Sequence, residues 1–238
     1  MQISSGQFKV PYYWISLGGT LLLTLFFLWM YFKTDINVSP KLPTLYAGLS
    51  TGFLIAFLQL CVAVLEAIKL TKYESMGVLE IRENRREEAY YKKLIQEAKS
   101  EIKVVGVTAS RFMEDFGNDD NASTKALINA LARGVVVKIL IPKHAHQSAA
   151  SLHKVQSLTI PLYENLRGKY PDNIFLKYFD HIAAQSMVST DDICIVGPVF
   201  GNKESKFTPS IVLTRNSTFA QPYFSNFESE WSSASDEP

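Results

Sequence analysis

The sequence has 238 residues and a formal net charge of +1, which allows one or two domains and gives no support to nucleic-acid binding by overall charge alone. Two cysteines are too few for a disulfide framework, which favours a reduced, cytosolic setting for the water-soluble part. The charges are unevenly placed, because residues 10–32 contain none. The composition therefore predicts a lipid-soluble part joined to a water-soluble part.

Two apolar runs near the N-terminus are each long enough to cross a bilayer. They cover residues 11–32 and 43–68, and a helix needs about 20 apolar residues to cross roughly 30 Å of hydrocarbon. Only residues 33–42 separate them, so the two helices should form an antiparallel hairpin. The first run has no small-residue cleavage site and is too long for the apolar core of a signal peptide. Residues 1–68 are therefore predicted to be a two-helix transmembrane hairpin.

The positive charges around these runs predict the orientation of the hairpin. Lys9 precedes the first span, while the connecting loop sets Lys33 and Lys41 against Asp35. Positive charge is retained on the cytoplasmic side of a membrane. Both termini are therefore expected in the cytoplasm, with the hairpin in the lipid bilayer of a bacterial inner membrane. The basic residues that follow the second span are Lys69, Lys72, Arg82, Arg85 and Arg86.

Small and polar residues recur within the second span. Gly48, Gly52 and Ala56 have a spacing of four residues, and Gln59 lies near mid-span. Small residues let helix backbones approach closely, and a polar group at this depth tends to face another helix or a water-filled cavity. We expect this stripe to pack within one hairpin. The alternative is contact between hairpins, which would make the chain a homo-oligomer with Gln59 at the subunit contact. The matching stripe of the first span is Ser16, Thr20 and Thr24.

The region after the hairpin begins with alternating helix and strand patterns. Residues 69–101 are predicted to form a juxtamembrane amphipathic helix that acts as a linker. A strand is expected over 102–107, a helix over 123–133 ending at Gly134, and a second strand over 135–141. The strand–helix–strand order predicts a parallel pair.

The remaining elements complete an α/β domain over residues 102–234. A helical stretch is predicted to end near Gly168, and a final helix contains Phe227 and Trp231. Residues 235–238 are expected to be a disordered tail. The fold class predicted for the whole chain is a membrane α-helical hairpin with a cytoplasmic α/β domain of mixed sheet and helices on both faces. The further strands are expected over 174–179, 187–190, 193–196 and 210–214.

Four stretches, taken in order, resemble a phospholipase D-like domain. They are LIQEAKSEIKVVGVT (94–108), ALINALARGVVVKILI (126–141), MVSTDDICIVGP (187–198) and FESEW (227–231). In active members of that superfamily, the hairpin carries a His, a Lys two residues later, and an Asp five residues after the Lys. The resemblance implies that the His would be a nucleophile that takes a phosphoryl group and that the Lys would bind phosphate oxygens.

The sequence departs from this catalytic pattern at its centre. The three slots hold Ala183, Gln185 and Thr190 in one register, and Ala184, Ser186 and Asp191 in the register shifted by one. Neither register supplies both a nucleophile and a cation. His181 lies just upstream and is the one candidate for a displaced nucleophile, but no Lys accompanies it. The departure predicts a domain without catalytic residues, cofactor or metal.

Five residues are candidates for binding a ligand or a partner. Thr108, Ser110 and Arg111 follow the first strand of the parallel pair, at the edge where open α/β sheets bind ligands. Arg111 is a candidate for an anion there; the alternative is a surface charge in a loop. His181 and Asp191 complete the set.

One further pair of histidines has the spacing of metal ligands. His144 and His146 would point the same way in an extended segment. The spacing indicates no third ligand, so a solvated loop is favoured over a zinc site.

The layout of two spans and a cytoplasmic module resembles the two-transmembrane effectors of bacterial anti-phage systems, in particular those paired with a retron reverse transcriptase and its RNA–DNA product. That resemblance implies a toxin that disrupts the inner membrane once released from an inhibitory reverse transcriptase–RNA/DNA complex. The alternative is an enzyme, namely a membrane-tethered phosphodiesterase or nuclease of the phospholipase D superfamily. A third hypothesis is a scaffold that only localises a partner. The missing His-x-Lys pair favours the effector.

Overall fold

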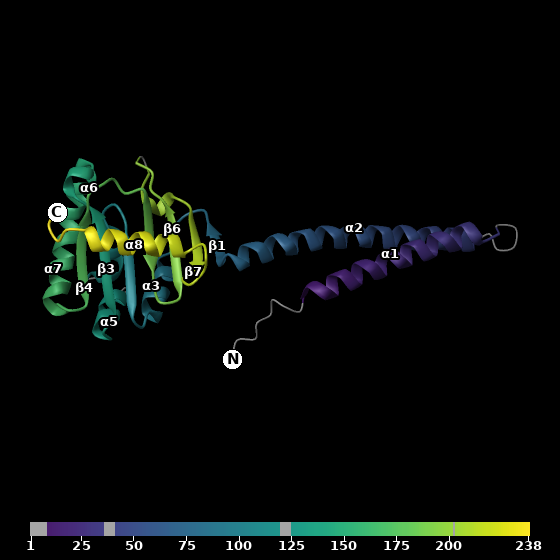
Figure 1. The fold of residues 1–238 in the computed structure, drawn as a ribbon, viewed down its shortest axis with the longest axis horizontal. Helices are drawn as coiled ribbons and strands as arrows, with labels where there is room; N and C mark the ends of the chain where they lie inside the picture. Colours follow the sequence, from purple (N-terminus) through teal and green to yellow (C-terminus); the bar gives the residue numbers. More distant parts are fainter. Residues whose placement is uncertain (1–8, 36–40, 120–124, 202) are drawn as a thin grey trace. The chain divides into compact units, whose positions relative to one another are not determined.

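The computed structural model of the chain describes residues 9–35, 41–119, 125–201 and 203–238. The chain divides into two compact units, Met1–Tyr73 and Glu74–Pro238. The first unit consists of two helices and the second contains a β-sheet with helices (Figure 1).

The first unit is an antiparallel helical hairpin. Its helices are α1 (Lys9–Lys33) and α2 (Leu42–Ser75), so the two predicted helices are confirmed. The ring of Phe27 stacks on that of Phe53 with a centroid distance of 5.6 Å. The Ser50 hydroxyl donates to the carbonyl oxygen of Thr24 at 3.4 Å, and both residues are buried. These contacts define the seam between the helices.

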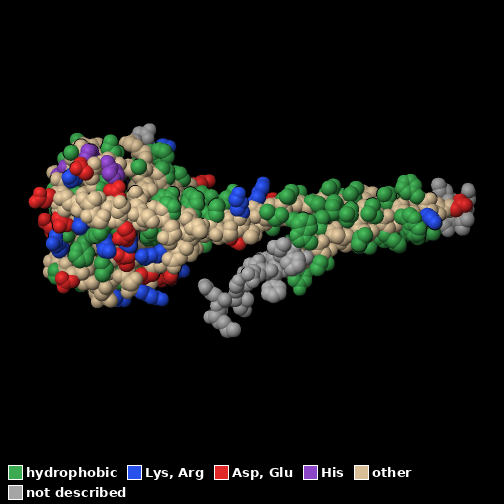
Figure 2. Space-filling view, viewed as in Figure 1, with side chains coloured by type: hydrophobic (Ala, Val, Ile, Leu, Met, Phe, Trp, Pro, Cys, Tyr) green, Lys and Arg blue, Asp and Glu red, His purple; other side chains and the backbone are tan. Residues whose placement is uncertain are grey.

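The remaining faces of the hairpin are apolar and exposed. Large side chains such as Ile15, Leu22 and Phe32 are 69–76% exposed. Hydrophobic side chains cover much of the described surface of both helices (Figure 2). Tyr12–Lys33 and Leu42–Ser75 are each long and apolar enough to cross a membrane.

The second unit is built on a seven-stranded mixed sheet of order β1-β7-β6-β5-β2-β3-β4. The pairs β2–β3 and β3–β4 are parallel, as the strand–helix–strand pattern predicts, and every other pair is antiparallel. The mixed sheet expected from the sequence is confirmed. The strands are β1 (Val78–Arg82), β2 (Glu101–Val105), β3 (Val136–Pro142), β4 (Ile174–Phe179), β5 (Gln185–Ser189), β6 (Ile193–Pro198) and β7 (Ser210–Thr214).

Helices cover both faces of this sheet, and α8 lies across one of them (Figure 1). The turn that ends α5 contains Gly134 at φ +88°, as expected for a helix C-terminus. Residues 123–124 of the predicted helix lie outside the described residues. The helices are α3 (Glu88–Glu97), α4 (Ser110–Gly117), α5 (Ala126–Ala132), α6 (Ala149–Lys154), α7 (Ile160–Lys169) and α8 (Gln221–Ser233), with a π-helical segment, Val155–Thr159, between α6 and α7.

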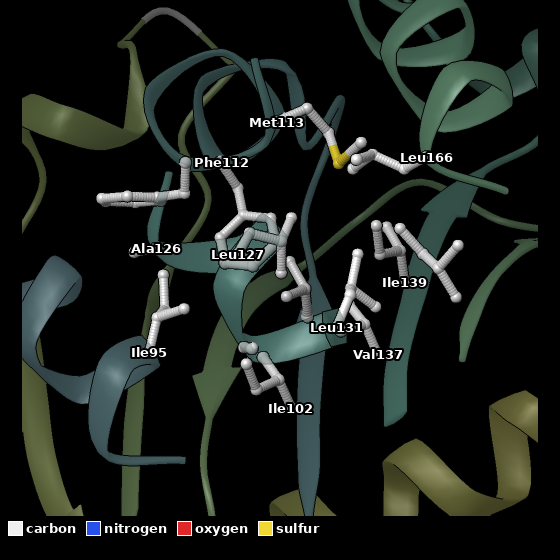
Figure 3. Packing of buried hydrophobic residues seen from close by; sticks show 14 of the residues in the cluster. Ile95, Ile102, Phe112, Met113, Ala126, Leu127, Leu131, Val137, Ile139 and Leu166 are labelled. Carbon is white, nitrogen blue, oxygen red and sulfur yellow. The ribbon is translucent and has the colours of Figure 1, made fainter. Parts of the chain in front are cut away.

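Strand alternation divides the core between the two faces. Val137, Ile139 and Ile141 of β3 pack in the cluster formed with α3, α4, α5 and α7 (Figure 3). Leu140, between them, packs in the second cluster with Phe227 of α8. All four β3 side chains are fully buried. A strand buried on both faces explains why the run over 135–141 alternates little and is apolar apart from Lys138.

The prediction of a long juxtamembrane helix over residues 69–101 is wrong, because a strand lies within it. Helix α2 ends at Ser75, and Gly77 has a φ of +82°, which a helix cannot accommodate. Strand β1 comes next in the chain, and α3 begins after it at Glu88. Strand β1 pairs with β7, which lies far downstream in the sequence. Local periodicity could not reveal this pairing. The segment from Glu74 onward therefore belongs to the sheet unit.

The prediction of a disordered C-terminal tail is also wrong at its first residue. Ser235 forms a β-bridge with Tyr178 of the edge strand β4. The Tyr178 nitrogen donates to the Ser235 carbonyl at 2.7 Å, and the Ser235 nitrogen donates back at 3.0 Å. Unpaired backbone groups on an edge strand favour this pairing, whatever the polarity of the tail.

Candidate functional site

A cleft of about 380 Å³ opens between α8 and the carboxyl ends of β2, β3 and β4. Parallel strands bring their carboxyl ends to one edge of the sheet, where ligands bind in open α/β folds. Gln185, the first residue of β5, and the two alanines before it form another wall. The cleft is therefore lined by both the parallel and the antiparallel part of the sheet. Its lining residues are Val105, Leu140, Phe179, His181, Ala183, Ala184, Gln185, Pro222, Tyr223, Asn226, Phe227 and Glu230.

His181 stands at this cleft with both ring nitrogens engaged. Nε2 lies 2.7 Å from Oε1 of Glu230, and Nδ1 lies 3.0 Å from the carbonyl oxygen of Ile182. The Ile182 carbonyl and then the Glu230 carboxylate raise the pKa of His181 above its ordinary value. Both acceptors favour an imidazolium that donates from each nitrogen. With Nδ1 on the Ile182 carbonyl and Nε2 on the Glu230 carboxylate, neither ring nitrogen is directed at a phosphorus atom in the cleft.

Two of the three positions that would carry phosphoryl-transfer residues, Ala183 and Gln185, lie in the wall of the same cleft. Ala183 is buried there and presents only a methyl group, and Gln185 contributes an amide. Thr190 is buried away from the lining residues, and its carbonyl accepts a hydrogen bond from Arg215 at 3.0 Å. Within the described part of the chain, the lining contains no Lys or Arg. The cleft therefore lacks an ammonium or guanidinium group to neutralise a phosphate.

In the register shifted by one, the polar side chains of Ser186 and Asp191 form hydrogen bonds with other parts of the chain. The Ser186 hydroxyl accepts a hydrogen bond from Nη1 of Arg85. The Asp191 carboxylate accepts from the backbone nitrogens of Lys99, at 2.5 Å, and of Ser100, at 3.1 Å. Asp191 therefore joins the β5–β6 turn to the start of β2 rather than facing the cleft.

The Thr108–Arg111 segment follows β2 and is tied down by internal contacts. The hydroxyl oxygens of Thr108 and Ser110 lie 2.9 Å apart, and the Thr159 hydroxyl donates to the Thr108 carbonyl at 2.7 Å. Ala109 between them has a φ of +51°, a left-handed conformation that an alanine adopts only when its surroundings hold it. These contacts place the segment in the packing of α4 and the π-helical segment.

Arg111 is likewise occupied. Its Nε forms an ion pair with Asp115 at 3.0 Å, and Nη1 and Nη2 donate to the carbonyls of Arg85, at 2.8 Å, and Arg86, at 3.3 Å. All three guanidinium nitrogens thus serve the chain itself. The arrangement supports a structural clamp on the loop before α3 rather than the anion site considered from the sequence.

His144 and His146 do not converge on one point. Nε2 of His146 lies 2.8 Å from Asp180, which also pairs with Lys143 at 2.9 Å, whereas the ring of His144 packs edge-on against Tyr178. Figure 2 shows His side chains gathered on one part of the α/β unit. No group of three or more His, Cys, Asp or Glu residues in the described ranges is arranged to hold a metal ion.

The candidate assembly residues of α2 lie away from the hairpin seam. Gly48, Gly52 and Gln59 are exposed, and Ala56 is partly exposed. A Cβ added at Gly48 or Gly52 would meet no atom of the described chain within 4 Å. The expectation that this stripe packs within the hairpin is therefore wrong. Ser50 lies at the seam instead. Both faces of α2 are apolar enough to pack on α1, so apolar character did not indicate which face would do so.

The hydroxyl stripe of α1 reaches the seam at Thr24, which is buried there, but the threonine hydroxyls bond within their own helix. Thr20 and Thr24 donate to the carbonyls four residues earlier in their own helix, at 3.0 Å and 2.8 Å. The cross-helix bond comes from Ser50, which sequence reasoning missed. Sequence reasoning also missed Glu230 as a residue of the cleft. Its spacing of three from Phe227 places both on one face of α8, and that spacing could have indicated it.

Comparison with solved structures gives distant likenesses. The chain is similar to TrmBL2, an archaeal chromatin protein described as showing a novel mode of DNA binding, at 16% identity and a TM-score of 0.45, over 80% of this chain and 70% of that one. It is similar to Nuc from Salmonella typhimurium, a phospholipase D family member, at 18% identity and a TM-score of 0.40, over 62% and 88%. It is similar to a phosphatidylserine synthase from Haemophilus influenzae Rd KW20 at 14% identity and a TM-score of 0.41, over 66% of this chain and 39% of that one. No family model and no curated protein matches the sequence.

Proposed function

We propose that this protein is a membrane effector, in which the helical hairpin acts within the bacterial inner membrane and the α/β unit binds a partner without catalysing a reaction. The supporting observation is the concentration of exposed large hydrophobic side chains on α1 and α2. Soluble proteins rarely expose apolar surface on this scale. A bilayer removes it from water, and each helix is long enough to span the hydrocarbon.

The proposal includes the topology inferred from charge. With both termini in the cytoplasm, the α/β unit meets cytoplasmic partners. The layout resembles retron-associated anti-phage effectors, so the partner proposed is a reverse transcriptase–RNA/DNA complex that holds the effector inactive. Release of that complex would then let the hairpins damage the membrane and arrest the infected cell.

Assembly of several hairpins is the proposed route to this damage. Gly48 and Gly52 offer a face on which another helix backbone can approach closely. Gln59 lies on the exposed part of the same helix, where contact with lipid is unfavourable for an amide. A second hairpin would cover the glycines and provide a hydrogen-bonding partner for Gln59.

Membrane potential in cells that express the full chain tests this proposal. We expect depolarisation by the unmodified chain and its loss in Gly52→Leu, because the added side chain keeps a second helix away. Gly18→Leu is the matched control, since Gly18 is an exposed glycine of α1 outside the stripe. His181→Ala should leave depolarisation intact. Equal activity of the Gly52→Leu variant and the unmodified chain would refute assembly through this face.

The competing function is a phosphodiesterase, and one observation favours it: an imidazole beside a carboxylate at a cleft. Against it stand the engaged ring nitrogens of His181 and the lack of a Lys or Arg among the described lining residues. Release of nitrophenolate from bis(p-nitrophenyl) phosphate by the purified chain, with loss of that activity in His181→Ala, would establish the enzyme and overturn the non-catalytic assignment.

A further inference from the structure

The cleft beside α8 has the size and floor of a small-molecule site. Its volume of about 380 Å³ falls at the small end of the range of roughly 300–1,000 Å³ that ligand clefts occupy. Leu140, Phe179, Ala183 and Phe227 are all buried and give it an apolar floor. Tyr223 adds a half-buried aromatic ring. A flat, largely apolar molecule suits such walls.

Two amides line the cleft from different elements. Gln185 begins β5, and Asn226 lies on α8. Neither side chain makes a hydrogen bond to the described part of the chain. A primary amide presents a donor and an acceptor side by side. That pair matches the adjacent donor and acceptor on the edge of a nucleobase.

The charges of the cleft restrict the ligand further. Glu230 is the carboxylate among the lining residues, His181 is the group that offsets it, and no Lys or Arg belongs to the described lining. A phosphate placed here would meet the Glu230 carboxylate with no described Lys or Arg of the lining to neutralise it, because His181 is already paired with that carboxylate. The lining is therefore suited to an uncharged ligand and opposes a nucleotide.

We propose that this cleft binds an uncharged planar nitrogen heterocycle, as a free nucleobase or nucleoside, with Gln185 and Asn226 reading its edge and the aromatic side chains covering its face. The inference rests on the proposed role of the α/β unit as a binding module and gives that module a ligand class. It does not depend on the membrane activity of the hairpin.

Calorimetric titration of the full chain in nanodiscs tests the proposal, with adenosine, guanosine, cytidine and uridine as separate probes. We expect saturable binding of at least one nucleoside with a dissociation constant of about 1 mM or tighter. The matching 5′-monophosphate should bind about tenfold more weakly, because its phosphate enters the field of Glu230. Glu230→Gln should reduce that difference.

Variants locate the binding. Gln185→Leu and Asn226→Leu should each weaken it about tenfold, whereas Gln156→Leu, an exposed glutamine of the π-helical segment, should not change it. Ala184→Trp fills the cleft from an exposed position and should abolish binding without disturbing the fold. Trp231 fluorescence, in chains with Trp14 and Trp29 changed to Phe, reports folding of each variant.

Three results would overturn the inference: no saturable nucleoside binding, binding unaffected by Ala184→Trp, or monophosphates that bind as tightly as nucleosides. The outcomes remain distinct from those of the depolarisation assay. Depolarisation without nucleoside binding removes this inference alone, whereas nucleoside binding without depolarisation leaves it standing and removes the membrane effector.

Discussion

The Oδ2 atom of Asp191 accepts a hydrogen bond from the backbone nitrogen of Lys99 at 2.5 Å. The same carboxylate also receives the Ser100 hydroxyl and the backbone nitrogen of Glu101. Burial alone would raise the pKa of Asp191, but these hydrogen bonds outweigh it and lower the pKa to about 2. One side chain thus secures the β5–β6 turn to the start of β2.

We expect Asp191→Asn to lower the free energy of unfolding by about 1 kcal/mol at pH 7, a value that allows for solvent screening. Because the folded pKa lies below the ordinary 3.8, the stabilisation is complete above that pH and is lost as the pH falls toward 2. Urea titrations over this range measure it. Asp192→Asn, at the exposed neighbouring position, is the control. Equal pH dependence of the two variants would contradict the assignment.

Arg85 supports a second prediction, because its guanidinium is buried without a carboxylate partner in the described part of the chain. Nη2 donates to the carbonyls of Pro198, at 3.3 Å, and Pro209, at 3.0 Å, and Nη1 donates to Ser186. Arg85→Met should leave these acceptors unsatisfied and cost about 3 kcal/mol.

The neighbouring Arg86 provides the control for that change. It is exposed, with its guanidinium over the ring of Phe207, so Arg86→Met should cost under about 1 kcal/mol. Denaturation followed by Trp231 fluorescence, with the other two tryptophans replaced, compares the two variants. Comparable losses would show that Arg85 does not secure the segment before α3.

Gly77 and Gly134 form a matched pair for a third prediction, since both have positive φ angles. A Cβ at Gly134 would meet open space, whereas one at Gly77 would lie 2.0 Å from Cβ of Ser217. Gly134→Ala should cost about 1 kcal/mol through backbone strain alone. Gly77→Ala should cost clearly more, and combining it with Ser217→Gly should recover part of the loss. A double variant no more stable than Gly77→Ala would exclude the steric explanation.

The proposed topology makes a fourth prediction. In a chain with Cys61 and Cys194 replaced by alanine, a cysteine at Lys41 should react with an impermeant maleimide added outside intact spheroplasts. A cysteine at Lys99, exposed on the α/β unit, should react only after lysis. Labelling of the Lys99 position in intact spheroplasts would reverse the orientation or place the hairpin outside the bilayer.

The sequence predicted most of the sheet because its strands are short, apolar and separated by turns. Strands β3, β4 and β7 lie within a residue of their predicted bounds. Strand β1 was missed, because its exposed positions resemble a continuation of the amphipathic helix and its partner β7 is remote in the chain. A pairing of that kind is a tertiary effect that local periodicity does not contain.

The candidate site was predictable only in part. The motif comparison led to Ala183 and Gln185, which lie in the wall of the cleft, and His181, noted just upstream of them in the sequence, also lines it. The opposite wall, with Asn226 and Glu230, depends on how α8 docks on the sheet. Within the hairpin, apolar character could not distinguish the seam from the outer face, because a helix in lipid is apolar on both.

The order of the strands has a mechanical consequence. Helix α2 continues into β1 after two residues, and β1 is the outermost strand, hydrogen-bonded only to β7 among the described strands. A tension carried along α2 therefore reaches the sheet at its margin and can unzip β1 from β7 one rung at a time, while the other six strands remain joined. The hydrogen bonds between β1 and β7 are therefore the first contacts of the sheet to bear that tension.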